Sequence, residues 1–272
     1  SFNSDGFSIG NNTALNTNAN NLVSWNWKAN GTGSSNTNGS ITSTVSASAT
    51  SGFSIVKYTG TGSNATVGHG LSTIPKMVII RKKDAQNNWQ VSHQPLNASI
   101  GDYSRYITLN STSPVSGANN TLFQNTAFTS SVFNIGTSGV TNDNGMVYIA
   151  YCFSDVPGYQ KSGFYTGNGN ADGIFCFTGF KPKFVLIKQA IGSNSTNWSI
   201  TDDKRLEYNP GEKILYPNTS AVEDSYDPIE HLSNGFKLIS STAGYNDSGD
   251  TYIYYAVGQS IVGSNNVPNN AR

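Results

Sequence analysis

The amino-acid sequence predicts an all-β protein made of two tandem β-sandwich (jelly-roll-like) repeat domains plus the C-terminal hairpin of a preceding repeat. Three observations predict this class. Asn, Ser, Thr and Gly dominate the polar residues, while charged residues make up only 12%. This mixture disfavours long helices and suits strands joined by tight turns. Short runs alternate apolar with polar residues, and one strand-and-turn pattern recurs along the chain.

The clearest recurrence is a polar turn followed by a strand. NDNGMVYIAYCF at 142–153 has a near double in NDSGDTYIYYAV at 246–257. Asn, Asp and Gly tolerate the positive φ that tight turns between strands require. A Phe precedes each turn, at Phe133 and Phe236, in a second short apolar run. Each copy is therefore expected to be a hairpin.

Period-two alternation assigns the two faces of these strands. The face expected to point into the core carries Ile149, Tyr151 and Phe153 in one copy, and Ile253, Tyr255 and Val257 in the other. The opposite face carries Tyr148, Tyr252 and Tyr254 and is expected to be partly covered. Strands packed on both faces imply stacked sheets. The nearest approach to a helix, residues 220–232, is expected to form at most one short turn.

A third copy of the hairpin motif stands near the beginning of the chain. Phe7 is followed by Asn16 and then by Trp25, each nine residues after the last. Val23 and Trp27 share a strand face with Trp25 under the same alternation. Residues 1–29 are therefore expected to be the terminal hairpin of an incomplete repeat. The rest of that repeat would belong to a longer parent chain, or the hairpin would complete a neighbouring unit.

The half that precedes the hairpin occurs twice and sets the domain boundaries. YTGTGSNATVGHGLSTIPKMVIIRK (58–82) parallels YTGNGNADGIFCFTGFKPKFVLIKQ (165–189) without a gap, and YITLNST (106–112) matches ILYPNTS (214–220). A unit of about 100 residues is a domain rather than a solenoid rung. The expected division is a terminal hairpin at 1–29, a Ser/Thr/Asn/Gly-rich linker with a possible edge strand at 30–51, β repeats at 52–156 and 157–260, and a tail at 261–272.

Charge and hydropathy exclude two kinds of partner. The chain has 16 basic and 16 acidic residues, so it has no electrostatic footprint for nucleic acid or an anionic membrane. No apolar run approaches the roughly 20 residues that span a bilayer. Cys152 and Cys176 lie in apolar strand-like runs and are expected to be buried small hydrophobes, with a disulfide left open.

The block GFSIVKYTGTGSNATVGHGL followed by PKMVIIRK resembles a repeated β-domain of large virion proteins from marine tailed bacteriophages. NGSITSTVSA, NGFKL…TYIYYAV and SFNSDGFSIG…VSWNWK are similar to the same family, so the resemblance covers nearly the whole chain. It implies a structural protein of a tail fibre or other surface appendage and transfers no catalytic residue. NADGIFCF departs from the family's GHGL turn, which leaves the role of that loop undefined.

The histidines do not form a catalytic pattern. His69 falls opposite Cys176 in the repeat alignment, and His93 falls opposite Asp202, so no His recurs. Neither a GxSxG elbow nor an HExxH pair is present. These histidines and His231 are expected to be solvated or locally bonded loop residues, and no catalytic residue is assigned.

Half of the acidic residues fall within one stretch: Asp202, Asp203, Glu207, Glu212, Glu223, Asp224, Asp227 and Glu230. A polysaccharide depolymerase would need two carboxyl groups about 5 Å or about 6.5–9.5 Å apart. The simpler interpretation is a solvated loop face with Lys204, Arg205 and Lys213 as local partners.

Two loop motifs invite a ligand but are better explained as turns. TNDNGM (141–146) and YNDSGD (245–250) lack the bidentate Glu of a calcium loop, and the third copy, LNTNAN (15–20), has no acid at all. TGTG and TGNG lack the following GK[ST] of a phosphate loop. We therefore expect no metal and no cofactor.

Aromatic residues keep a sugar-binding surface open. Trp89 and Trp198 are equivalent and are expected to be core anchors, whereas four tyrosines in less regular segments remain candidates for exposure: Tyr103, Tyr106, Tyr226 and Tyr245. Nothing in the sequence singles out a ligand contact. A lectin-like site would show an exposed aromatic with adjacent amides.

The sequence thus predicts a non-enzymatic virion structural protein, a tail-fibre or other surface-appendage module at the virion surface. Its expected partners are further copies of itself, with a trimer preferred by analogy, other virion proteins, and candidate host-surface glycans. A capsid decoration or head-fibre protein is one alternative. A lectin-like or polysaccharide-depolymerising spike module is the other.

Overall fold

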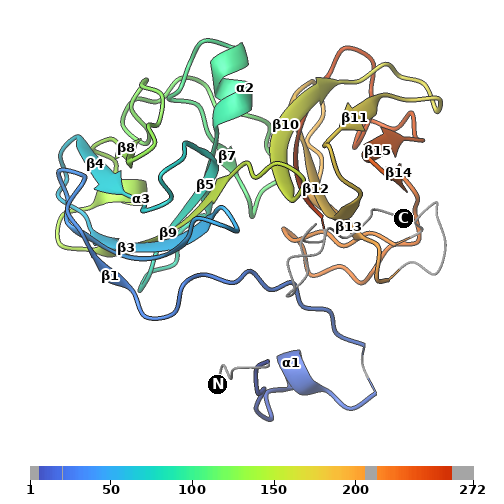
Figure 1. Cartoon of the computed structure of the whole chain (residues 1–272). Coiled ribbons are helices and arrows are strands. Elements are labelled where there is room, and N and C mark those ends of the chain that lie inside the picture. Colours follow the sequence, from blue (N-terminus) through green and yellow to red (C-terminus); the bar gives the residue numbers. More distant parts are fainter. Residues whose placement is uncertain (1–5, 20, 206–212, 259–272) are drawn as a thin grey trace.

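The structure of the chain is a computed structural model that describes residues 6–19, 21–205 and 213–258. These residues form sixteen strands and three short helices, so the predicted all-β class is confirmed (Figure 1). The helices are α1 (Thr13–Asn16), α2 (Gln94–Ser99) and α3 (Gly139–Asn142). As far as the chain is described, none of its helices has the length and apolar character needed to cross a membrane.

The strands up to residue 156 are β1 (Ser34–Asn36), β2 (Ser43–Ser48), β3 (Phe53–Thr59), β4 (Ala65–Gly68), β5 (Pro75–Lys82), β6 (Gln90–His93), β7 (Ile107–Thr108), β8 (Val132–Ile135) and β9 (Val147–Ser154). Those of the second repeat are β10 (Gln160–Thr166), β11 (Phe175–Phe177), β12 (Pro182–Ile191), β13 (Ser199–Asp202), β14 (Ile229–Leu232), β15 (Gly235–Leu238) and β16 (Thr251–Gly258). Figure 1 shows the two sets of strands as two bodies side by side.

The two repeats order their strands in the same way. A seven-stranded sheet runs β1-β2-β3-β9-β5-β6-β7, and a four-stranded sheet runs β10-β16-β12-β13. The series β3-β9-β5-β6 therefore matches the whole second series, strand for strand. The smaller sheets match as well, because β4 pairs with β8 and β11 pairs with β15, which also pairs with β14. All of these pairings are antiparallel.

Each large sheet covers its own core on one face. In the first repeat, Val56 and Val78 of the large sheet pack in one cluster with Val67 and Phe133 of the small sheet. The second repeat builds the same arrangement from its large sheet and the β11-β15-β14 sheet, around the buried Phe236. Each repeat therefore encloses an apolar core between two sheets.

A third core joins the repeats. It takes Phe53, Met77, Val91, Leu96, Ile107 and Phe153 from the first repeat, and Phe184, Leu186, Ala190, Trp198, Ile200, Ile253 and Tyr255 from the second. We call it the shared core. Backbone bonds cross it too: Val115 N donates to Ala190 O over 2.7 Å. The repeats are thus joined by an apolar interface rather than by a linker alone.

The shared core corrects the predicted assignment of faces. Tyr151 and Phe153, expected inside the repeat, pack against the other repeat instead. Tyr148 and Tyr252, on the face expected to be only partly covered, are fully buried in the repeats' own cores. Alternation identified two faces, but both are apolar, so it could not tell which neighbour each would meet.

The repeated NDxG turn is built around a fully buried Asn. Asn142 accepts from Thr61 N at 2.8 Å and donates Nδ2 to Gly136 O at 2.7 Å. Asn246 repeats both bonds, accepting from Asn168 N at 3.0 Å and donating to Ser240 O at 2.9 Å. We call this the asparagine clamp. Since the amide engages backbone groups of the TGxG loop and of the residues before the turn, its role is structural.

A glycine of the TGxG loop and a pair of stacked tyrosines beside the loop accompany the asparagine clamp in each repeat. A Cβ at Gly60 would lie 2.3 Å from Asp143 O, so only Gly allows this close approach. Stacked tyrosines from neighbouring strands lie beside the loop, with Tyr58 on Tyr148 at 5.3 Å and Tyr165 on Tyr252 at 5.1 Å. The predicted tight bend in TGxG is therefore needed for contact between turn and loop.

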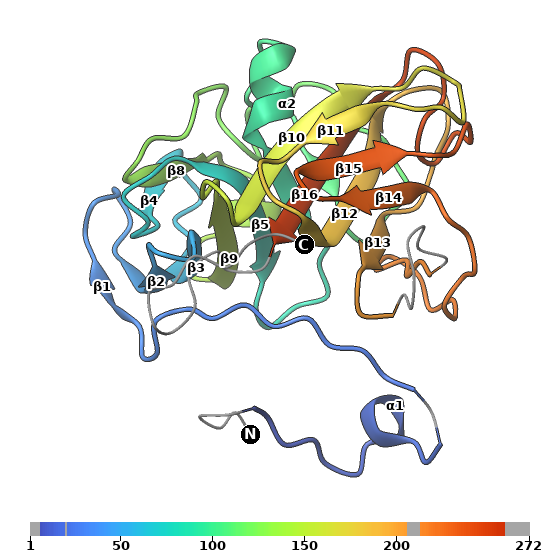
Figure 2. The same ribbon diagram turned by 45° about the vertical axis from the view of Figure 1, so that its right-hand side comes forward.

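The described part of the predicted N-terminal hairpin is not built from paired strands. No named strand lies within residues 6–19 and 21–29, which contain α1 and a single β-bridge residue, Phe7. Figure 2 shows this stretch running along one side of the sheets. A central strand such as β9 pairs with β3 and β5, whereas residues 21–29 have no backbone–backbone hydrogen bond to another described residue.

Other local predictions can be compared with the structure. Residues 30–51 hold β1 and β2, which extend the first sheet at its edge. Residues 220–232 form no helix and end in β14. Helix α2, whose first turn is capped by His93, was not predicted. The tail at 261–272 lies outside the described residues. Cys152 and Cys176 are free and buried, as expected, and burial raises the pKa of each thiol to about 12.

Candidate binding pocket

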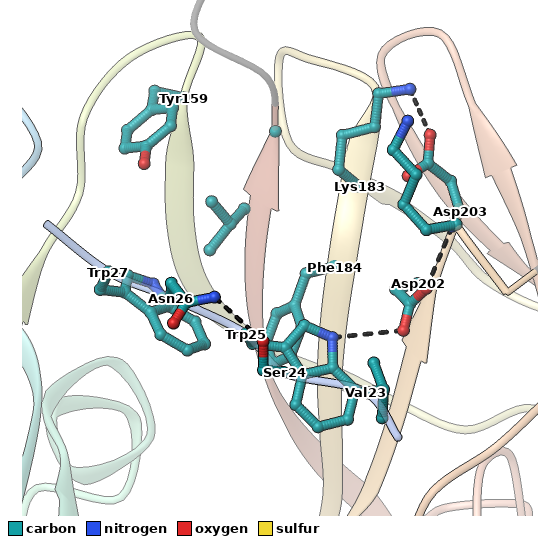
Figure 3. Close-up of a pocket in the computed structure, with 13 residues that line it drawn as sticks. Val23, Ser24, Trp25, Asn26, Trp27, Tyr159, Lys183, Phe184, Asp202 and Asp203 are labelled. Atoms are coloured by element: carbon teal, nitrogen blue, oxygen red, sulfur yellow. Dashed lines mark hydrogen bonds and ion pairs between the residues drawn. The ribbon is translucent and has the colours of Figure 1, made fainter. Parts of the chain in front are cut away.

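A pocket of about 460 Å³ opens where residues 23–27 cross the second repeat (Figure 3). Its floor is formed by Phe184 on β12 together with Val257 and Gly258 at the end of β16. The run SWNW alternates, so that Trp25 and Trp27 are half-buried while Asn26 between them is exposed. An extended chain with period-two alternation places both indole rings against the sheet.

Both tryptophans are held by edge-to-face packing and by hydrogen bonds. Their rings lie 5.9 Å and 5.4 Å from the ring of Phe184. Trp25 Nε1 donates to Asp202 Oδ2, and Trp27 Nε1 donates to Tyr255 Oη, each over 3.2 Å. Both polar ends are satisfied by the protein, which fixes the ring planes.

Ion pairs balance the charges at the rim. Arg205 Nε donates to Asp202 Oδ2 at 2.7 Å, and Arg205 Nη1 donates to Glu223 at 2.8 Å. Lys183 Nζ pairs with Asp203. Burial alone would raise the pKa of Asp202, but its hydrogen bonds and ion pair with Arg205 hold that pKa below its usual range. The carboxylate is therefore ionised at neutral pH.

The acidic cluster divides between this pocket and its surroundings. Asp202 and Asp203 line the pocket, and Glu223 joins through Arg205 and through Lys213 at 3.3 Å. Arg205 and Lys213 are thus partners of this cluster, as predicted, although Asp202 is buried in β13 rather than solvated. Glu207 and Glu212 lie outside the described residues. A glycosidase also needs a carboxylic acid that stays protonated, and Asp202 does not meet that requirement.

The three histidines are buried, which corrects the expectation of solvated loop residues. His69 Nε2 lies 3.2 Å from Thr129 O, and His231 Nδ1 lies 3.0 Å from Pro182 O. His93 Nδ1 accepts from Leu96 N at 3.3 Å and caps α2. The predicted local bonding holds for His93, and for His69 through Leu71 N at 3.2 Å, whereas His231 lies in β14 and bonds to a distant strand. Burial lowers the pKa of all three imidazoles.

Acid is expected to destabilise the protein through His93. Burial lowers the pKa of His93 from 6.5 to about 4, so the unfolded chain takes up the proton first as the pH falls. The stability from neutral His93 is complete above pH 6.5 and is lost as the pH falls toward 4. This loss is about 2.5 kcal/mol at about pH 4.5.

Urea unfolding at neutral pH and at about pH 4.5 measures this loss. His93→Asn keeps an acceptor that can cap α2 but removes the titrating group. The variant is expected to lose about 2.5 kcal/mol less than the natural chain between the two pH values. Equal losses in both proteins would contradict the assignment.

The other aromatic candidates divide by burial. Trp198 is fully buried, as expected of a core anchor, whereas Trp89 is half-buried beneath Arg81, whose guanidinium lies 4.8 Å above the ring. Tyr103, Tyr106 and Tyr226 are partly exposed, but Tyr245 is buried. Sequence reasoning missed Trp25 and Trp27 as pocket residues because it placed them in a strand of another repeat. The sequence did contain a pattern typical of a sugar-binding surface, because the amide of Asn26 lies between Trp25 and Trp27.

The described ranges contain no candidate metal centre. No group of three His, Cys, Asp or Glu side chains within residues 6–19, 21–205 and 213–258 has the geometry of a metal site. The fold and the pocket thus define an all-β protein with an aromatic, charge-balanced pocket at its surface.

The chain belongs to the family described as domain of unknown function DUF7483, whose profile matches residues 1–260. No curated protein and no solved structure matched the chain.

Proposed function

We propose that the chain is a non-enzymatic structural module of a virion surface appendage, formed by two tandem jelly-roll-like β-sandwich repeats. The observation that carries this proposal is the shared core, which joins the repeats into one body through aromatic side chains of both large sheets. An appendage must resist bending, and such an interface opposes relative motion of the domains. The position at the virion surface rests on the sequence resemblance, and a capsid decoration or head-fibre protein remains the alternative.

The titratable side chains support a structural role. The three histidines are buried, and Asp202 is ion-paired. The asparagines of both NDxG turns bind backbone groups. Gold-labelled antibodies against the chain, viewed on intact particles by electron microscopy, test the proposal. Label on the outside of tail or head appendages supports it, and label confined to lysate debris would refute it. Sedimentation of the purified chain tests the expected trimer.

A second candidate function is glycan contact, which the pocket favours. Indole rings bind the C–H face of a pyranose, and amides and carboxylates bind its hydroxyl groups. Trp25, Asn26 and the carboxylate of Asp203 line the pocket together. Lys183 and Arg205 offset the charges of Asp203 and Asp202, and Lys204 also lines the pocket, so the charges present do not exclude neutral hexoses.

Trp25→Ala is expected to weaken binding of a neutral oligosaccharide by about tenfold or more, because it removes one stacking ring worth about 1.4 kcal/mol. The ligand would be chosen from a glycan array and its affinity measured by titration calorimetry. Trp25→Phe should retain most of the affinity, and Trp89→Ala, outside the pocket, should retain all of it. Equal affinity in Trp25→Ala and in the natural chain would refute this site.

A further inference from the structure

The N-terminal segment, defined as residues 6–19 and 21–29, has the local structure of the two complete hairpins. Its helix α1 aligns with α3, and both end at the Asn of the clamp. In all three copies the Asn side chain donates to the carbonyl six residues earlier: Asn16 to Gly10 at 2.8 Å, Asn142 to Gly136 at 2.7 Å and Asn246 to Ser240 at 2.9 Å. The third copy therefore keeps the fold of the turn without the sheet.

Half of the asparagine clamp is missing from this copy. Asn142 also bonds with Thr61 N and Ser63 O of the TGxG loop. Asn16 is exposed and makes no such bond within the described chain. Likewise, residues 21–29 make no backbone–backbone hydrogen bond with other described residues, whereas β9 pairs on both sides. The missing partners are a TGxG loop and two flanking strands.

The apolar face that would meet these partners is uncovered. Ile9, Leu15 and Leu22 are 46%, 59% and 58% exposed. Their counterparts in the first repeat, Ile135, Thr141 and Tyr148, are each 0% exposed. The same positions in the second repeat, Leu238, Tyr245 and Tyr252, are also buried. Within the chain itself, two copies thus show what covers this face.

The other face of the segment already occupies its place. Trp25 and Trp27 align with Tyr151 and Phe153 of β9, and with Tyr255 and Val257 of β16. All six side chains pack on the shared core. Trp27 lies 6.2 Å from Phe153 and hydrogen-bonds to Tyr255. Each of the three copies of the motif therefore contributes an equivalent pair of apolar side chains to the shared core.

We propose that the N-terminal segment is the inner hairpin of a third β unit, and that its partner is a polypeptide half-unit of the kind found at 52–131. That half carries the YTGxG strand, the Pro-Lys strand and the loop that closes the clamp. In both complete repeats such a half-unit stands before its hairpin in chain order. The half-units of a second copy are already filled by their own β9 and β16, so a second copy does not fit. This inference rests on the tandem-repeat architecture proposed above.

The test joins a copy of residues 52–131 directly to Gly6 of the otherwise complete chain. This junction reproduces the first repeat, in which Ser131 precedes the hairpin. Leu22→Cys reports on the face that should become covered, and Val222→Cys, which is 86% exposed and lies in the second repeat, is the matched control. The two natural cysteines are buried. We expect the thiol at position 22 to react at least tenfold more slowly in the fusion than in the chain alone, with no change at position 222.

Hydrogen exchange in the same fusion provides a second readout. Amides of residues 22–28 should exchange at least tenfold more slowly than in the chain alone, since they would enter a sheet. A fused half carrying Gly60→Val should protect neither the thiol nor the amides. Unchanged labelling and exchange in the fusion would overturn the inference.

A variant of the unfused chain guards against a fusion that fails to fold. Ile9, Leu15 and Leu22 changed together to Ser should leave its melting temperature unchanged, because that face is uncovered. A fall of several degrees would mean that the face is already packed, and would also overturn the inference. None of these readouts depends on glycan or virion, so they can fail while the proposed function stands.

Discussion

Asn246→Ala is expected to lower the free energy of unfolding by about 3 kcal/mol or more. The substitution leaves Asn168 N, Asn170 O and Ser240 O without the partner that the fully buried Asn246 side chain supplies. An unsatisfied buried polar group costs about 1–3 kcal/mol. Urea unfolding followed by circular dichroism measures the loss. Asn142→Ala should cost a similar amount, because the first repeat contains the same clamp.

The chain offers a matched control for this prediction. Asn16 makes the same bond to the carbonyl six residues earlier, but it is exposed and lacks the TGxG contacts. Asn16→Ala is therefore expected to change stability by less than about 0.5 kcal/mol. If Asn16→Ala and Asn246→Ala cost the same, the bonds to the TGxG loop would contribute nothing, and the clamp would be only a local turn.

Much of the fold could be predicted because its signals are local. Turn residues and period-two alternation act within one hairpin, and duplication repeats them in register. Pro75 and Pro182 occupy equivalent positions in the two repeats. They are the first residues of β5 and β12, and each strand has a register shift beside its proline. The aligned segments at 106–112 and 214–220 supply the same contact, since Asn110 accepts from Trp89 N and Asn218 accepts from Trp198 N.

The arrangement of the repeats depends on contacts that sequence patterns do not encode. Both faces of β9 and β16 are apolar, so alternation could not show that Tyr151 and Tyr255 meet between the repeats. Strand formation also depends on partners. The run LVSWNWK has the pattern of a strand, yet among the described residues it has no backbone pairing partner.

The pocket was beyond prediction for the same reason. Its residues come from the N-terminal segment and from β12, β13 and β16, which lie far apart in the sequence. Each signal was visible alone, as an SWNW run and as an acidic pair at Asp202 and Asp203. Only the tertiary fold places the indole of Trp25 within hydrogen-bond distance of Asp202.

Several hydrogen bonds between the two repeats lie near Trp198 in the shared core. Trp198 Nε1 donates to Thr108 O in the first repeat at 3.0 Å. Nearby, the buried Lys188 donates to Thr112 O at 2.9 Å, and burial lowers the pKa of this amine to about 8. These bonds connect β7 and the loop after it to the second repeat. A substitution that removes them should therefore destabilise both repeats.

Trp198→Ala is expected to cost about 3–5 kcal/mol, because it opens a cavity in the shared core and removes one of the two hydrogen bonds that Thr108 O accepts, the other coming from Ser111 N. Urea unfolding measures the cost. Trp89→Ala is the matched control, since Trp89 holds the equivalent position in the first repeat but is only half-buried; it should cost about 1–2 kcal/mol. If the two variants lose equal stability, the shared core contributes no more than a surface contact. The claim that it joins the repeats into one body would then fail.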